Sequence, residues 1–288
     1  MREARTPKIC AVEHTESLNA HLPEAHFAHA NGFPAGSYQQ LFKYLEKHLQ
    51  VFALDKFAHN PQYPLVDNWV HQVDELIDFV EHNKQSEKVV ALGHSFGAVI
   101  SYIACCKRPD LFSGLLMLDP PLATGFARHI FRFAKSNRLI NKVTPAAKTQ
   151  MRKQSWHKDD DLLAYFKARA LFKNMDERCV LDYINSVTAV KGDYRHLMFK
   201  RDIEAQIFRT LPHNLHDYFG QLQCPATLIT ARYTDVCTER LRKPFLKHNP
   251  GVKHLELHTG GHMFPLEHPK LVAEAVINEL QAWHLQGL

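Results

Sequence analysis

The feature that most constrains this chain is the pentapeptide Gly-His-Ser-Phe-Gly at residues 93–97, a G-x-S-x-G pattern. It directly follows the apolar run 89–92 and directly precedes the apolar run 98–104, so the sequence predicts a strand, a tight turn and a helix. A serine at the apex of such a turn has a strained backbone, and small glycines must flank it. The pattern therefore predicts a nucleophile, Ser95, held above the edge of a sheet. An ordinary glycine-rich turn is the alternative.

A serine hydroxyl needs two partners before it becomes a good nucleophile. A histidine must accept its proton, and a carboxylate must orient that histidine. On a doubly wound sheet both lie in loops after later strands, with the acid before the histidine in the chain. Asp235 follows the predicted buried strand 225–232, and His262 ends a glycine-containing loop, 259–262. We therefore predict Ser95, Asp235 and His262 as the catalytic residues.

A second carboxylate, Asp119, competes with Asp235 for the role of the acid. It ends the predicted strand 115–118 and precedes two prolines. We favour Asp235 because the acid usually follows the later strand. Asp119 would then hydrogen-bond near the site or cap a turn.

On these segments the chain resembles the α/β-hydrolase superfamily over nearly its whole length. The resemblance is carried by residues 29–34, by the pentapeptide 93–97, by the strand that ends before Asp235, and by residues 261–269. It implies an α/β fold with a mostly parallel, doubly wound sheet. Dehalogenases and epoxide hydrolases of this family use an aspartate as nucleophile, so Ser95 implies a hydrolase that passes through an acyl-enzyme.

The resemblance also implies an oxyanion hole made of two backbone amides. Asn31 and Gly32 stand where the family has His-Gly, so one implied donor is the amide of Phe33. The other is the amide of Phe96, directly after the nucleophile.

The segment 122–215 differs in character from the rest of the chain. Strand signals stop there, and apolar residues recur at helical spacing, for example after the acidic residues 159–161. The segment resembles the helical cap that many of these hydrolases fold over the active site. We predict an α/β-hydrolase core of residues 1–121 and 216–288, with a helical cap, 122–215, inserted in the same domain.

The positive charge of the chain is concentrated in this cap. Residues 120–215 contain 18 lysines and arginines and 9 acidic residues, a net charge of +9, whereas the whole chain has +5. This excess indicates either a solvated helical face or a surface that attracts anionic substrates or acidic lipid surfaces. No recognition motif or aromatic platform accompanies it, which argues against nucleic-acid binding.

Twenty histidines raise the question of a metal site. His258 and His262 are separated by glycines, and His26 and His29 lie in a predicted strand, where positions three apart point to opposite faces. No carboxylate motif accompanies either pair, so we predict no metal and no cofactor. The six cysteines form no C-x-x-C pair and are expected to be packing residues.

Residues 1–7 contain two arginines and no apolar run, so we expect no secretory signal. No run of about 18 apolar residues, as a membrane span requires, occurs in the sequence. The corresponding expectation is a cytoplasmic protein. No heptad or interface motif indicates its oligomeric state.

We therefore predict a serine hydrolase that cleaves a carboxylic ester or related acyl bond of a small molecule through an acyl-enzyme. The alternatives with the same residues are a lactonase, a thioesterase, a carbon–carbon bond hydrolase and an acyltransferase. A binding module that kept the fold and lost catalysis is the non-enzymatic alternative.

Overall fold

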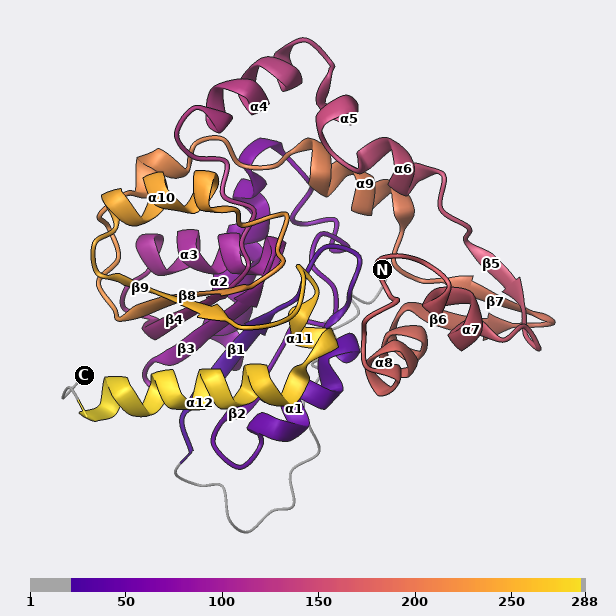
Figure 1. Ribbon diagram of the computed structural model, residues 1–288, viewed down its shortest axis with the longest axis horizontal. Coiled ribbons are helices and arrows are strands. Elements are labelled where there is room, and N and C mark those ends of the chain that lie inside the picture. Colours follow the sequence, from indigo (N-terminus) through magenta and orange to yellow (C-terminus); the bar gives the residue numbers. More distant parts are fainter. Residues whose placement is uncertain (1–21, 286–288) are drawn as a thin grey trace, which may run out of the picture.

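A parallel six-stranded sheet forms the centre of the molecule (Figure 1). The computed structural model describes residues 22–285, so the segment 1–7, on which the expectation of no secretory signal rests, lies outside the described residues. The strand order is β2-β1-β3-β4-β8-β9, and every neighbouring pair is parallel. The strands are β1 (Glu24–Ala28), β2 (Gln50–Phe52), β3 (Val89–His94), β4 (Phe112–Leu118), β8 (Ala226–Ala231) and β9 (Val252–Leu257).

Helices cover both faces of this sheet (Figure 1). One face carries α1 (Gln39–Leu45) and α12 (Pro269–Leu285), and the other carries α2 (Val70–Asn83), α3 (Phe96–Lys107) and α10 (Glu239–His248). The shorter helical segments of the core are η1 (Ala35–Tyr38), η2 (Asp67–Trp69), η3 (Leu215–Tyr218) and α11 (Phe264–Glu267). The predicted α/β fold with a mostly parallel, doubly wound sheet is confirmed. No helix among residues 22–285 has the length and apolar character that crossing a membrane requires.

The central strands are apolar on both sides because each side faces a separate hydrophobic core. In β4, Leu116 and Leu118 enter the core beneath α1 and α12, whereas Leu115 and Met117 enter the core beneath α2 and α3. All four are fully buried. Such two-sided burial explains why these strands read as continuous apolar runs rather than as alternating patterns.

The cap lies between β4 and β8 in the chain and extends from one end of the sheet (Figure 1). Its helices are α4 (Ala127–Ser136), α5 (Ile140–Val143), α6 (Ala146–Gln150), α7 (Leu162–Lys167), α8 (Glu177–Val187) and α9 (Arg201–Arg209). It also contains a three-stranded antiparallel sheet made of β5 (Ser155–His157), β6 (Thr188–Lys191) and β7 (Tyr194–Leu197).

The prediction of a purely helical cap is therefore wrong. The cap strands have three or four residues and are largely exposed, so they show no alternation of apolar and polar residues. A turn signal was present in the sequence: β6 and β7 are joined by Gly192-Asp193, and Gly192 has a φ of 63°. A two-residue Gly-Asp loop is a recognised hairpin connection.

Two buried histidines lie at the end of β1. His26 packs against the rings of Phe52, Phe57 and Phe79, and neither of its ring nitrogens has a hydrogen-bond partner within residues 22–285. His29 also contacts Phe57, so the two rings share one face, contrary to our expectation. The reason is that β1 ends at Ala28, so the alternation of a strand no longer sets the direction of the His29 side chain.

Burial lowers the pKa of His26 to about 3 and that of His29 to about 4. The unfolded chain takes up protons at both rings near pH 6.5, and the folded chain does not. Stability due to these rings is therefore present above pH 6.5 and is lost as the pH falls. Glu75 changes the stability in the opposite direction as the pH falls, because burial raises the pKa of its carboxyl to about 8.

We predict that His26→Phe makes the protein less sensitive to acid. Between pH 6 and 4 the free energy of unfolding should fall less steeply, by about 1.4 kcal/mol per pH unit, because one proton fewer is taken up on unfolding. Urea unfolding followed by tryptophan fluorescence measures this slope. The exposed His48 provides the control, as His48→Gln, and equal slopes in the two variants would contradict the prediction.

Candidate active site

Ser95 sits at the turn between β3 and α3 with a φ of 54° and a ψ of −116°. This conformation is unfavourable for a residue with a side chain, at a cost of about 1–3 kcal/mol. The turn is held by a hydrogen bond from the Ser95 amide to the carbonyl of Leu118, 2.8 Å long, and by one from the Ala98 amide to the Ser95 carbonyl, 3.1 Å long. The side chain remains half-buried rather than enclosed.

The two glycines of the motif are required because backbone segments approach each other closely. A Cβ on Gly97 would lie 2.0 Å from the carbonyl oxygen of Ala28 in β1. A Cβ on Gly93 would lie 2.5 Å from the carbonyl carbon of Gly97. Any larger residue would push α3 away from the sheet and displace Ser95.

His262 lies in the loop between β9 and α11 and reaches the serine directly. Its Nε2 is 3.0 Å from Ser95 Oγ, and its Nδ1 is 2.5 Å from Asp119 Oδ2. An ionised carboxylate only accepts hydrogen bonds, so Nδ1 carries the proton and donates to Asp119. In the neutral ring Nε2 then accepts the hydrogen of the Ser95 hydroxyl. This is the arrangement of a nucleophile, a general base and an orienting acid.

The structure corrects our prediction that Asp235 is the acid. Asp119 is completely buried and makes the hydrogen bond to His262, whereas Asp235 is exposed and has no part in this chain of hydrogen bonds. Asp119 directly follows β4 and has a φ of 47°, which directs its side chain away from the line of the strand. Aspartate tolerates this left-handed region better than most residues.

The sequence placed the two carboxylates in equivalent positions. β4 and β8 are neighbours in the sheet, so Asp119 and the loop before Asp235 reach the same edge. That loop supplies Thr234 instead, whose hydroxyl donates to Asp119 Oδ2 at 2.6 Å. The Thr234 oxygen in turn accepts hydrogen bonds from the amides of Val236 and Cys237, at 3.1 and 3.4 Å. Thr234, in the loop after β8, therefore holds the carboxylate of Asp119, which follows β4.

A buried network behind the serine was not predicted from the sequence. His94 Nε2 donates to the carbonyl oxygen of His262 at 2.9 Å, so its Nδ1 must accept a hydrogen bond from the Tyr38 hydroxyl, 2.8 Å away. The same hydroxyl accepts the Ala30 amide at 3.2 Å. Burial, together with the nearby His262, lowers the pKa of His94 well below its usual value and keeps the ring neutral. The network joins the serine turn, the histidine loop and the loop after β1.

The two predicted oxyanion donors differ in their hydrogen bonding. Phe96 is the first residue of α3, and the first amides of a helix have no partner within it. This amide also lies at the positive end of the helix dipole, which favours a developing negative charge. The amide of Phe33, by contrast, closes a turn by donating to the carbonyl of Ala30 at 3.0 Å. The Phe33 amide therefore already has a backbone acceptor, whereas the Phe96 amide begins a helix that offers it none.

The cap is attached to the loop that carries Phe33. Glu204 of α9 lies so close that a Cβ on Gly32 would be 2.7 Å from its Oε1. The backbone carbonyl of Glu204 accepts a hydrogen bond from the Asn31 amide nitrogen at 2.9 Å. Arg152 binds Glu204 Oε2 at 2.6 Å and also donates to the Tyr183 hydroxyl. These cap residues were not singled out in the sequence, since they are far apart along the chain.

Aromatic side chains of the cap pack over the same loop. The ring of Phe33 lies 4.8 Å from that of Tyr183 and 5.6 Å from that of Phe172, measured between centroids. All three residues are buried. The loop that carries Phe33 is therefore covered on its cap side by aromatic rings as well as by the ion pair of Arg152 and Glu204.

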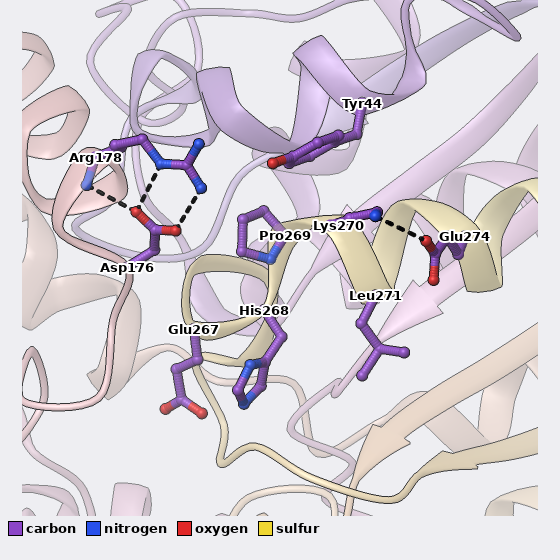
Figure 2. A pocket seen from close by; sticks show the side chains of 9 residues that line it. All are labelled: Tyr44, Asp176, Arg178, Glu267, His268, Pro269, Lys270, Leu271 and Glu274. Atoms are coloured by element: carbon purple, nitrogen blue, oxygen red, sulfur yellow. Dashed lines mark hydrogen bonds and ion pairs between the residues drawn. The ribbon is translucent and has the colours of Figure 1, made fainter.

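A surface cavity of about 440 Å³ lies away from the serine, where α8 meets α1 and the start of α12 (Figure 2). Its charged side chains pair with one another, Arg178 with Asp176 at 2.7 Å and Lys270 with Glu274 at 3.9 Å. None of Ser95, Asp119 and His262 lines it. Among residues 22–285, no three histidine, cysteine or acidic side chains are grouped as metal ligands would be.

Comparison with known families agrees with this geometry. The model of the family described as "Alpha/beta hydrolase family" matches residues 27–275, which is most of the chain. The chain therefore belongs to the alpha/beta hydrolase family.

Two curated relatives are a monoglyceride lipase and a homolog of such a lipase. The monoglyceride lipase homolog of monkeypox virus is 27% identical over 127 residues, which cover 42% of this chain and 45% of the viral protein. The monoglyceride lipase of Rattus norvegicus is 30% identical over 100 residues, which cover 32% of this chain and 33% of the rat protein. The chain thus matches less than half the length of either relative.

Among solved structures, the peroxisomal alpha-beta-hydrolase Lpx1 of Saccharomyces cerevisiae superposes with a TM-score of 0.74 at 14% identity. The match covers 98% of this chain and 89% of the yeast chain. At this identity the likeness concerns the fold. The family and the lipase relatives together support a hydrolytic enzyme.

We predict that Gly97→Ala destabilises the protein by about 3 kcal/mol or more, at the upper end of the usual effect of overpacking, because the new methyl group meets the backbone of β1. Thermal unfolding measures the effect. Gly251 is the matched control, because a Cβ there has no neighbour within 4 Å. If both alanine variants lowered the stability equally and only slightly, α3 could move away from β1 without destabilising the protein, which would contradict the prediction.

We predict that Asp119→Asn slows the labelling of Ser95 by a fluorophosphonate by about two orders of magnitude or more, because the amide can hold His262 in the wrong tautomer. Asp235→Asn is the matched variant and should label at nearly the rate of the unaltered protein. Time courses of labelling give both rates. If Asp235→Asn proved the slower of the two, the assignment of Asp119 would fail.

Proposed function

We propose that this protein is a serine hydrolase that cleaves a carboxylic ester, or a related acyl bond, through an acyl-enzyme intermediate. The observation that carries the proposal is the continuous chain of hydrogen bonds from Ser95 through His262 to the buried Asp119. Neither the serine nor the histidine has another role in the fold that would explain this alignment. The strained turn that exposes Ser95 supports the same conclusion.

In the first half of the reaction, Ser95 Oγ attacks the carbonyl carbon of the substrate. His262 Nε2 takes the hydroxyl proton as the bond forms, and Asp119 stabilises the imidazolium that results. The tetrahedral intermediate then collapses, and His262 returns the proton to the leaving alcohol. In the second half, water loses a proton to His262 and attacks the acyl carbon. The bond to Ser95 Oγ then breaks, His262 returns the proton to Oγ, and the acid is released.

The negative charge of the tetrahedral intermediate needs fixed donors. The Phe96 amide, at the start of α3, is the donor best placed for it. The Phe33 amide would contribute by sharing its hydrogen between Ala30 and the oxyanion. Loss of one such donor commonly raises the barrier by about 3 kcal/mol.

An apolar acyl or alcohol group is the favoured substrate feature. The buried rings of Phe33, Phe172 and Tyr183 supply apolar surface on the cap side, and the curated relatives include a monoglyceride lipase and a monoglyceride lipase homolog. The lactonase, thioesterase, carbon–carbon hydrolase and acyltransferase alternatives would use the same residues. They differ in the group that the cap admits.

We predict that the protein hydrolyses p-nitrophenyl esters and that Ser95→Ala lowers kcat by about four orders of magnitude or more. Over acyl chains from C2 to C12, kcat/KM should rise up to about fourfold per added methylene until the site is filled, since each buried methylene contributes about 0.8 kcal/mol.

The exposed Ser113 supplies the control, as Ser113→Ala, which should retain full activity. Hydrolysis that persists in Ser95→Ala would disprove the nucleophile. Labelling of Ser95 by a fluorophosphonate without ester hydrolysis would point instead to acyl transfer, and no labelling would point to a binding module.

A further inference from the structure

Helix α4 presents an apolar stripe to solvent. Phe126, Ile130 and Phe133 follow one another at intervals of four and three residues, so they lie on one face of the helix. Their exposed fractions are 69%, 42% and 63%. Large apolar side chains with such exposure on one helix face call for an explanation in a soluble fold.

The helix is fixed on its other side, so this exposure is not a sign of a loosely attached segment. Ala134 is buried, and Phe131 packs against the core beneath α2 and α3. The ammonium group of Lys135 binds both the carboxylate of Asp67 and the carbonyl of Leu211. The stripe therefore points outward from a rigid support, and α4 lies at the outer edge of the molecule (Figure 1).

The charged residues of the chain segment that carries the stripe have one sign. Residues 120–158 contain nine lysines and arginines and no aspartate or glutamate. Residues 159–215 contain nine of each, so the whole positive excess of the cap comes from this stretch. Exposed members include Arg132, Lys142 and Lys148. Outside 120–158 the chain has 26 basic and 30 acidic residues, which is a net charge of −4.

We propose that this face of the cap docks on an anionic phospholipid bilayer. We call it the basic cap surface and define it as Phe126, Ile130 and Phe133 together with the exposed basic residues Arg132, Arg138, Lys142 and Lys148. The apolar stripe enters the boundary between headgroups and acyl chains, and the lysines and arginines bind the lipid phosphates. Aromatic and aliphatic residues on one helix face, flanked by basic side chains, suit this type of surface.

A bilayer fits this surface better than a second copy of the chain does. In a symmetric dimer the same patch would face itself, which would bring two sets of like charges together around the apolar contact. Nucleic acid would satisfy the charge but would leave the exposed phenylalanines in water. Only an anionic lipid surface satisfies both the charge and the apolar stripe.

Docking would also place the site near its substrate. The chain runs directly from Asp119 at the end of β4 to α4, and Thr124 in this connection donates to the carbonyl of Leu241 at 2.5 Å. This consequence rests on the proposed function, whereas the docking itself does not.

Co-sedimentation with vesicles tests the docking without any enzymatic reaction. The full chain is mixed with vesicles of phosphatidylcholine alone and with vesicles that contain about 30% phosphatidylglycerol, a composition that gives a negative surface potential. We expect partitioning onto the anionic vesicles to be at least about tenfold stronger, and to weaken steeply as salt is added.

Two sets of substitutions separate the charge from the apolar stripe. Arg132→Glu, Lys142→Glu and Lys148→Glu together should reduce partitioning about tenfold or more, because three attractive charges become repulsive. Phe126→Ser with Phe133→Ser should also reduce partitioning by about tenfold or more, while the remaining binding keeps its salt dependence.

Matched controls lie elsewhere on the surface. Val190→Ser with Tyr194→Ser removes apolar side chains of similar exposure, 53% and 54%, from the β6–β7 hairpin. A second control set reverses three exposed charges on the α/β-hydrolase core, outside the cap, with Lys43→Glu, Lys47→Glu and Lys88→Glu. Both control sets should bind like the unaltered protein, and equal midpoints of thermal unfolding show that every variant is folded.

Several outcomes would overturn the proposal. These are no sedimentation with anionic vesicles, equal binding to neutral vesicles, or binding that survives both sets of substitutions on the basic cap surface. Self-association through α4 without lipid binding would do the same. A protein that binds anionic vesicles but hydrolyses no ester would support the docking and disprove the proposed function, so the two are tested separately.

Discussion

The close approach of α3 to the ends of β1 and β3 is the constraint on which the rest of the site depends. It leaves no room for a side chain at Gly93 or Gly97, and it forces Ser95 into a left-handed conformation. The strain is acceptable because two large hydrophobic cores fix the strands and the helix around the turn. Packing across the whole sheet therefore maintains the exposed serine hydroxyl.

The parallel sheet then brings the other groups to the same edge. β3, β4 and β9 all end there, so Ser95, Asp119 and His262 meet although they are far apart in the chain. Thr234 fixes the acid from one side, and His94 fixes the histidine loop from behind. Asp119 and the loop of His262 are thus each held by an element other than their own.

The cap contributes to the site in two ways that its composition does not reveal. Its inner side contacts the loop after β1 through Glu204, which Arg152 holds in place, and through the rings that pack on Phe33. Burial raises the pKa of the Glu204 carboxyl, and the adjacent Arg152 partly offsets this effect. Its outer side carries the apolar stripe of α4 and the positive charge. The inner side contacts the loop that carries Phe33, and the stripe on the outer side is exposed.

Local sequence determined much of this protein. The apolar runs on both sides of the pentapeptide 93–97 fixed the strand, turn and helix around Ser95, because the period and the glycines admit few other structures. The doubly wound sheet followed from the resemblance of several segments to the α/β-hydrolase superfamily. The cap strands β5, β6 and β7 were not predicted, because they are short and largely exposed and show no periodicity in the sequence.

Only the tertiary structure decided which carboxylate serves His262. Asp119 and Asp235 both follow buried strands, and those strands are neighbours. The sequence pattern alone therefore does not distinguish which of the two carboxylates hydrogen-bonds to His262. What separates them is the direction of one side chain, set by the φ of Asp119, and the burial that the neighbouring loop provides. The tautomer of His94 and the contact of Glu204 with Gly32 could not be predicted from the sequence either. Both depend on the three-dimensional packing of segments that are distant in the chain.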